Sequence, residues 1–285
     1  MITNIKHLCY VLKSNINTIE NIIDNIDAYY VSWDKIKTDK DTNQPILVNG
    51  EPKVRHLNST KSDLKKIQKR IYKFLLKEIT LPEYAYGGVS KRDNVINAKK
   101  HQGNKYIFTT DLKAFFPSIS HKDVFLLYLE LGFSPTISRI LTKLTTYNFQ
   151  LPQGVPTSTI LANLVFRKTG DKILEFAKSN NITFTTFVDD ITLSSKKDFK
   201  EKIPDILNII VNDGYAISHQ KTFYKTKNPV ITGIICQNNK LKLEQTLYKR
   251  ATRLKLMKEA QPDDNKAIKR HEGLLRYKQK VKNCK

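Results

Sequence analysis

Three aspartates have the residue type and the order along the chain that divalent metal ions require. Asp111 ends a run of β-branched and aromatic residues, and Asp189 and Asp190 stand between two similar runs. Nucleotidyl transfer to a 3′-hydroxyl uses two divalent cations about 4 Å apart. Mg²⁺ prefers hard oxygen ligands such as carboxylates. The three acids are therefore candidate ligands for two Mg²⁺ ions, with Mn²⁺ as the alternative.

Neither half of this set is specific by itself. An Asp-Asp pair is common in turns, and a strand that ends in aspartate is equally ordinary. The segment LPQGVPTS, residues 151–158, lies between the two halves, and its Gly154 and Pro156 would let the backbone approach a nucleotide closely. The order of the three segments is more informative than any one of them.

The elements that must position the acids are strands. Residues 106–111, YIFTTD, have strand composition, and TFTTFVDDITLSS is the clearest hairpin of the sequence, with the Asp-Asp pair in its turn. Phe187 and Val188 precede the pair, and Ile191 and Leu193 follow it. We expect the hairpin to be buried against a core while its tip stays polar.

The rest of the chain mixes helices and strands. Apolar residues at three- and four-residue spacing predict helices, and β-branched or aromatic runs predict strands. We expect helices at residues 1–30, 60–80, 121–145 (broken near Gly132 and Pro135), 201–213 and from Gln245 onward, and strands within 31–58 and 218–243. This mixture predicts an α+β fold.

The charge of the chain indicates a polyanionic partner. Its 285 residues include 49 Lys and Arg against 27 Asp and Glu, which gives a formal net charge of +22. A lysine-rich proteome that needs solubility would explain only a modest excess. Binding to a membrane surface is a weaker alternative, because the basic segments also carry the pattern of a folded domain.

The remaining bulk properties limit the class of protein. Hydrophobic residues make up 40% of the chain, and the sequence has no run of about 18 apolar residues that would predict a membrane-spanning helix. The N-terminus is too polar for a signal peptide, so we expect the cytoplasm. The three cysteines, Cys9, Cys236 and Cys284, have no paired spacing and are expected to be free thiols.

Five segments, in this order, resemble the motif blocks of reverse transcriptases, and most closely those of the bacterial retron type. The match runs from about Ile36 to the C-terminal helices. The fingers block is resembled by AYGGVSKRDNVINAKKH. The first, second and third palm motifs are resembled in turn by TTDLKAFFPSI, LPQGVPTSTILANL and FVDD. The fourth palm motif is resembled by the KT of HQKTFYKT.

The resemblance implies catalytic roles. Asp111 and Asp189 would be the principal metal ligands and Asp190 the third carboxylate. The ring of Phe116 would crowd a ribose 2′-hydroxyl and so favour dNTPs, although core packing is the alternative for one ring of Phe115-Phe116. Lys221 would assist pyrophosphate departure as a general acid, or would be an ordinary surface lysine.

The resemblance also implies nucleotide contacts. Gln153 and Gly154 would line the nucleotide pocket. Arg92, with Lys91 beside it, would face the triphosphate, since a guanidinium binds phosphate in a bidentate way. Arg55 is a further candidate, against the alternative that a basic residue on a hairpin is solvated.

Two short blocks resemble retron enzymes in particular, and there they are associated with recognition of a structured RNA. Asn97-Ala98-x-x-His101 resembles NAxxH, and Ile231-Thr232-Gly233 resembles VTG. Local hydrogen bonding and a strand-end bulge are the respective alternatives. A basic C-terminal thumb would contact phosphates of an RNA–DNA duplex, through residues that include Lys249, Arg250 and Arg253.

The sequence departs from the family pattern at three places. The third palm motif begins Phe-Val where Tyr-Ala is commoner, Ala114 replaces an acidic residue, and Ile231 stands for valine. No departure removes a catalytic carboxylate, so we expect activity to survive. The sequence ends soon after the thumb, so we expect no fused RNase H, maturase, endonuclease or toxin domain.

The implied fold is a right hand. Its fingers would span residues 1–104 and 119–152, its palm 105–243 and its thumb 244–285. The implied function is RNA-directed DNA synthesis that copies part of a cognate noncoding RNA into branched, RNA-linked DNA for anti-phage defence. Partners would be that RNA, the RNA–DNA duplex, dNTPs and a separate effector protein. The alternatives are another defence-associated polymerase and a catalytically idle RNA-binding scaffold.

Overall fold

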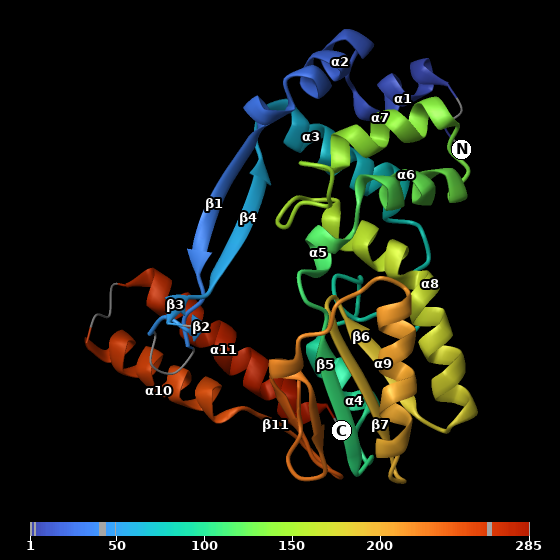
Figure 1. Cartoon of the computed structure of the whole chain (residues 1–285). Coiled ribbons are helices and arrows are strands. Elements are labelled where there is room, and N and C mark those ends of the chain that lie inside the picture. Colours follow the sequence, from blue (N-terminus) through green and yellow to red (C-terminus); the bar gives the residue numbers. More distant parts are fainter. Residues whose placement is uncertain (1, 3, 40–43, 49, 261–263, 285) are drawn as a thin grey trace.

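The chain folds as α+β around antiparallel sheets (Figure 1). A computed structural model describes residues 2, 4–39, 44–48, 50–260 and 264–284. The expected mixture of helices and antiparallel strands is confirmed, except that the predicted strand over residues 218–226 begins with a 3₁₀ turn and is a strand only at Phe223–Lys225. Within the described residues, no helix has both the length and the apolar character needed to cross a membrane.

A four-stranded antiparallel sheet lies at the centre, in the order β6-β7-β5-β8. Its strands are β5 (Tyr106–Asp111), β6 (Thr183–Phe187), β7 (Asp190–Ser195) and β8 (Phe223–Lys225). β6 and β7 are the predicted hairpin, and β7 pairs with β5 along six residues. The long helix α8 (Ser158–Ser179) packs on β6, and α9 (Ile203–Asn212) packs on α8.

The N-terminal half contributes a helical body at the top of Figure 1. It contains α1 (Ile5–Leu12), α2 (Ile16–Asp24), the 3₁₀ turn η1 (Ile26–Tyr29) and α3 (Ser62–Ile71), which continues through the π-helical turn η2 (Tyr72–Leu76). The helices α6 (His121–Glu130) and α7 (Pro135–Thr145) return to this body, and α7 contacts both α2 and α3.

The predicted break between α6 and α7 has a local cause. Gly132 has φ of +85°, which a residue with a side chain rarely adopts. Ser134 then caps α7 by accepting from the amide of Ile137, and Pro135 sits in the first turn, where its missing N–H costs nothing. The short helix α5 (Phe115–Ser118) precedes α6 and follows β5.

A two-stranded ribbon extends away from the helical body, toward α10 and α11 in the view of Figure 1. It pairs β1 (Tyr30–Ile36) with β4 (Val54–Thr60), and a smaller hairpin of β2 (Leu47–Val48) and β3 (Glu51–Pro52) lies between them in sequence. The two predicted strands around a turn are thus confirmed. The Asn49-Gly50 turn signal falls partly on Asn49, which lies outside the described residues.

The C-terminal part forms a second apolar cluster. A three-stranded sheet of β9 (Val230–Ile231), β10 (Ile234–Cys236) and β11 (Leu241–Leu243) leads into α10 (Gln245–Ala260) and α11 (Asn265–Asn283). The helix α4 (Asn94–Lys100) packs against β6, β9 and β10, and α11 packs on β11. Two more 3₁₀ turns, η3 (Lys200–Lys202) and η4 (His219–Lys221), complete the fold.

Candidate active site

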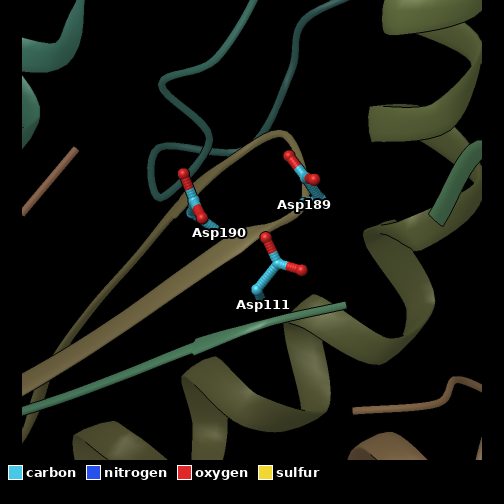
Figure 2. A group of neighbouring side chains, drawn as sticks. All are labelled: Asp111, Asp189 and Asp190. Carbon is cyan, nitrogen blue, oxygen red and sulfur yellow. The ribbon is translucent and has the colours of Figure 1, made fainter. Parts of the chain in front are cut away.

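The three predicted carboxylates meet at one end of the central sheet (Figure 2). Asp111 ends β5 and is the register partner of Asp190, which begins β7, while Asp189 lies in the preceding turn. One oxygen from each carboxylate lies within 4.8 Å of the other two. Asp111 is buried and the other two are half-buried. Two neighbouring strands therefore bring three acids to one point, as the sequence predicts.

The turn that carries Asp189 is held in a strained conformation. Val188 has φ of +60°, which is rare for a β-branched residue. A Cβ at Gly87 would lie 2.5 Å from the Val188 nitrogen, so only glycine allows the chain to pack this closely over the turn. The amide of Leu112 donates to the Asp189 carbonyl at 2.9 Å. Contacts from both sides thus fix the turn that orients the acid.

The electrostatics of the cluster favour a bound cation. Burial, followed by the nearby charge of Asp111, raises the pKa of Asp189, whereas Lys221 and Arg55 act in the opposite direction. Lys221 forms an ion pair with Asp111. A carboxylate whose ionisation is opposed by burial and a neighbouring acid is stabilised in its charged form when a cation binds beside it. The donor set, three hard carboxylates, fits a divalent ion of the Mg²⁺ type.

A groove of about 580 Å³ opens beside the carboxylates. One wall comes from the central sheet and includes Asp111, Asp190 and Phe187. The opposite wall contains Thr232 and Gly233. Lys221 also lines this groove. Two of the three acids, Asp111 and Asp190, therefore line a groove that a polymeric ligand could enter.

Two cations of the ribbon lie in the electric field of the acids. Arg55 on β4 acts against the rise in the pKa of Asp189 that burial and Asp111 cause. Burial and then the charges of Arg55, Lys221 and Lys53 lower the pKa of Lys37, while Asp111 acts to raise it. Lys37 is not among the residues predicted from the sequence. Its backbone amide donates to the Lys53 carbonyl at 2.8 Å, so strand pairing was the signal that could have found it.

Arg92 is engaged by the chain itself. Its Nη1 donates to the carbonyl oxygens of Pro82 and Ala85, each at 2.6 Å, and its guanidinium lies over the Tyr86 ring at 5.6 Å. These contacts hold the loop that carries Gly87. Lys91 beside it is exposed. Lys221, Lys37 and Arg55 are electrostatically coupled to the carboxylates, whereas Arg92 binds backbone carbonyl oxygens.

The two phenylalanines after Asp111 separate into different environments. Phe115 is buried and packs against Phe166 and Tyr215, with ring centroids 5.7 and 5.9 Å away. Phe116 is only half-buried. Phe115 is thus the ring that packs in the core, which leaves Phe116 as the one able to meet a ligand.

Gly154 is needed for a contact within the protein. It has φ of +116°, and a Cβ there would lie 2.6 Å from the Asn58 carbonyl oxygen of β4. The Asn58 amide donates to the Gln153 carbonyl at 2.9 Å. The close backbone approach expected at this segment is therefore made to the ribbon. Gln153 remains half-buried and Gly154 exposed.

The NAxxH block is inside the molecule. His101 is fully buried, and its ring nitrogens hydrogen-bond Ser194 of β7 and Thr185 of β6, both at 2.7 Å. Burial lowers its pKa to about 3, so the ring is neutral. Asn97 is also fully buried and donates to the Thr232 hydroxyl at 3.4 Å. In this arrangement neither side chain is accessible to RNA.

The ITG block and the basic helix α10 are more exposed than the NAxxH block. Thr232 and Gly233 form the tight turn between β9 and β10, with φ of +46° and +83°, and both are half-buried. Lys249, Arg250 and Arg253 are exposed on α10. The NAxxH and ITG blocks therefore touch each other through Asn97 and Thr232, while the α10 cations are available to a partner.

Comparison with known proteins places this site in a family. Residues 40–255, most of the chain, match the family described as reverse transcriptase (RNA-dependent DNA polymerase). The chain therefore belongs to the reverse transcriptase family. All three carboxylates fall inside the matched range.

The curated relatives include several retron enzymes. The chain is 36% identical over 176 residues to the retron Se72 reverse transcriptase of Salmonella heidelberg (strain 579083-10), an alignment that covers 60% of this chain and 46% of that protein. It is 31% identical over 203 residues to the retron Ec86 reverse transcriptase of Escherichia coli, an alignment that covers 70% of this chain and 63% of that protein. The match thus spans about half to two thirds of these relatives. The prediction of a retron-type reverse transcriptase is confirmed.

Proposed function

We propose that this protein is an RNA-directed DNA polymerase whose catalytic centre is the cluster of Asp111, Asp189 and Asp190. The observation that carries the proposal is the meeting of these three carboxylates on adjacent strands, at an open groove, within the range that matches the family. These acids would hold divalent ions, and their oxygen ligands favour Mg²⁺. The ions would activate the primer 3′-hydroxyl and stabilise the charge on the phosphoryl group.

The side chains around the acids have distinct proposed roles. Lys37 and Arg55 bind the triphosphate of the incoming dNTP, because their charges are already coupled to the carboxylates. Lys221, paired with Asp111, donates a proton to the leaving pyrophosphate. Phe116 excludes a ribose 2′-hydroxyl, and Gln153 lies along the same pocket.

The proposed architecture is a right hand. Its fingers are residues 1–104 and 119–152, its palm 105–243 and its thumb 244–285. The return of α6 and α7 to the N-terminal helices supports the split fingers. The helix α4 falls in the first range by sequence but packs against the sheets of the palm. The exposed cations of α10 would follow the phosphates of an RNA–DNA duplex.

The relatives' names support a retron role. We propose that the chain copies part of a cognate noncoding RNA, starting from a 2′-hydroxyl, into RNA-linked DNA. The proposal includes a role in anti-phage defence beside a separate effector protein. Sequencing the nucleic acid that copurifies tests it: one DNA joined to one RNA supports the retron role, whereas untemplated DNA would assign the chain to another kind of defence polymerase.

The direct test is primer extension by the purified protein on an RNA template with dNTPs and Mg²⁺. We expect extension by the wild type and none by the double variant Asp189→Ala/Asp190→Ala. The matched control is Glu201→Ala/Asp205→Ala, which removes two exposed acids, one on η3 and one in the first turn of α9. Robust synthesis by the first variant would disprove the site, and a wild type inactive on every RNA template would favour the scaffold alternative.

A further inference from the structure

A second groove lies on the N-terminal helices, separate from the catalytic one. Its volume is about 600 Å³, and it shares no lining residue with the groove beside the carboxylates. Its lining residues come from the end of α1, from the start of α2 and from α3, helices that lie at the top of Figure 1. We name it the α1–α3 groove; its polar lining includes Lys13, Ser14, Thr18, Lys66, Lys69 and Arg70.

The groove is strongly basic. The helical run of residues 61–77 contains seven Lys and Arg and one Asp. That acid, Asp63, pairs with Lys66 at 2.9 Å. Across the described ranges of the chain, Lys13, Lys69 and Lys73 form no ion pair. The local positive charge is therefore left for a partner to neutralise.

Arg70 is held in place at the edge of the groove. Its Nε donates to the Val11 carbonyl at 2.7 Å, and its guanidinium lies 4.9 Å from the centre of the Phe74 ring. Lys73 lies 5.0 Å from the same ring. A guanidinium fixed by one nitrogen and a ring keeps its other donors for an anion and loses little entropy on binding.

The backbone presents the Phe74 side chain outward. A regular helix with its apolar stripe at Leu64, Ile67 and Ile71 would next turn residues 74 and 75 inward. Instead η2 is a π-helical turn, closed by the Lys77 amide on the Tyr72 carbonyl at 2.8 Å. Leu76 is therefore buried and Phe74 is 49% exposed. Such π turns cost stability and are frequent at functional sites.

Cations recur every three or four residues along this helix, at Lys66, Lys69, Arg70 and Lys73, so they form a row roughly parallel to its axis. Such a row of cations, next to the Phe74 ring that Arg70 and Lys73 flank, suits the phosphate backbone of a nucleic acid. An acidic protein would be an alternative partner. The net charge of +22 and the family of the chain favour nucleic acid.

We infer that the α1–α3 groove binds the phosphate backbone of folded RNA outside the catalytic groove. The inference rests on the proposed function for the presence of an RNA partner, and it deepens that function. A template held at the carboxylates would then be tethered at a second, distant place. Recognition there is by shape and charge, as for base-paired RNA in general.

The test is charge reversal in the groove with a matched control elsewhere. Lys69→Glu/Lys73→Glu changes one exposed residue that lines the groove and one exposed neighbour on η2, next to Phe74. Lys178→Glu/Lys202→Glu makes the same charge change on α8 and η3. The probe is a labelled RNA hairpin of about 16 base pairs, read by fluorescence anisotropy at several salt concentrations. A DNA hairpin of the same sequence and primer extension on poly(rA)/oligo(dT) are measured beside it.

The groove variant should bind the RNA hairpin roughly tenfold more weakly, with a salt slope lower by about two, as expected for two lost phosphate contacts. The control variant should bind the RNA hairpin as tightly as wild type. The groove variant should extend the oligo(dT) primer on poly(rA) at a rate near that of wild type. Equal losses in both variants, no loss in the groove variant, or a loss on DNA alone would overturn the inference. A wild type without extension would count against the proposed function only, because hairpin binding is read separately.

Discussion

At the scale of single residues, the cations near the acids can be ranked. Lys37 and Arg55 share the field of the carboxylates, while Lys35 lies on the same ribbon as the register partner of Arg55 and is exposed. Arg92 is bound to carbonyl oxygens. The sequence resemblance named Arg92 before Arg55, because a basic residue in a known block looks the same in sequence whether its side chain binds a phosphate or a backbone loop.

Removing either ribbon cation should weaken dNTP binding. We expect Lys37→Ala and Arg55→Ala each to raise the KM for dNTP about tenfold, since a charge-assisted contact to phosphate contributes roughly 1.5–3 kcal/mol. Lys35→Ala is the matched control and should leave KM near wild type. Steady-state primer extension over a range of dNTP concentrations measures this, and an equal effect of Lys35→Ala would reject the assignment.

Phe116 should set the choice of sugar. Phe116→Ala opens space beside the proposed nucleotide pocket, so incorporation of rNTPs relative to dNTPs should rise about tenfold to a hundredfold, the range typical of a steric pocket contact. Competition assays with rNTP and dNTP measure the ratio. Phe115→Leu, in the buried core, should instead lower stability and leave the ratio unchanged. An unaltered ratio in Phe116→Ala would show that another group selects the sugar.

At the scale of elements, α4 braces the hairpin that carries two of the acids. His101 bridges Thr185 on β6 and Ser194 on β7, behind the Asp189 turn. Asn94 of the same helix donates to the Thr232 carbonyl at 3.0 Å. One short helix thus joins the catalytic hairpin to the β9–β10 turn. The Asn/His spacing was visible in the sequence, but its burial depends on tertiary packing that spacing does not encode.

The buried ring of His101 should make stability fall in mild acid. Its pKa is lowered to about 3 by burial, whereas in the unfolded chain it is about 6.5. Between these values the unfolded state binds one more proton, so the free energy of unfolding decreases as pH falls through about 6.5 toward 3. From pH 7.5 to 5.5 we expect this histidine to account for about 1.4 kcal/mol of lost stability.

The control for this pH effect is His101→Gln, whose side chain keeps donor and acceptor groups but does not titrate. The difference between wild type and variant in urea-unfolding free energy should change by that amount over the same pH range. A second comparison is His219→Gln on η4, which replaces an exposed histidine and leaves the contacts of His101 untouched. Parallel pH profiles for wild type and His101→Gln would contradict the buried, neutral assignment.

Many of the helices and strands could be predicted from the local sequence pattern. The strands around Asp111 and the Asp189–Asp190 hairpin were predictable because alternation and turn residues are local signals. The π turn at Tyr72–Leu76 was not, because the stripe Leu64, Ile67, Ile71 and Leu75 fits an ordinary helix. Nor was the position of Lys37, because the placement of the ribbon depends on tertiary contacts such as the hydrogen bond from the Asn58 amide to the Gln153 carbonyl.

At the scale of the whole molecule, the C-terminal helices are anchored at a small number of points. Tyr277 of α11 accepts a hydrogen bond from Asn94 at 2.6 Å, and Lys280 pairs with Asp93, the residue that caps α4. Val281 is buried in the second apolar cluster. The basic face of α10 is therefore positioned through α11 and α4, which themselves support the catalytic hairpin.

Loosening this anchor should shorten products without slowing a single addition. Tyr277→Phe/Lys280→Ala removes the hydrogen bond, worth about 1 kcal/mol, and the ion pair, while leaving the carboxylates untouched. Because α10 would hold the duplex less firmly, dissociation between additions should rise. Extension against a heparin trap should give products severalfold shorter, at an unchanged rate of first-nucleotide addition. Lys282→Ala removes the same charge from α11 without the Asp93 contact and should behave as wild type. Equal product lengths in all three proteins would show that α11 docking does not govern the grip on the duplex.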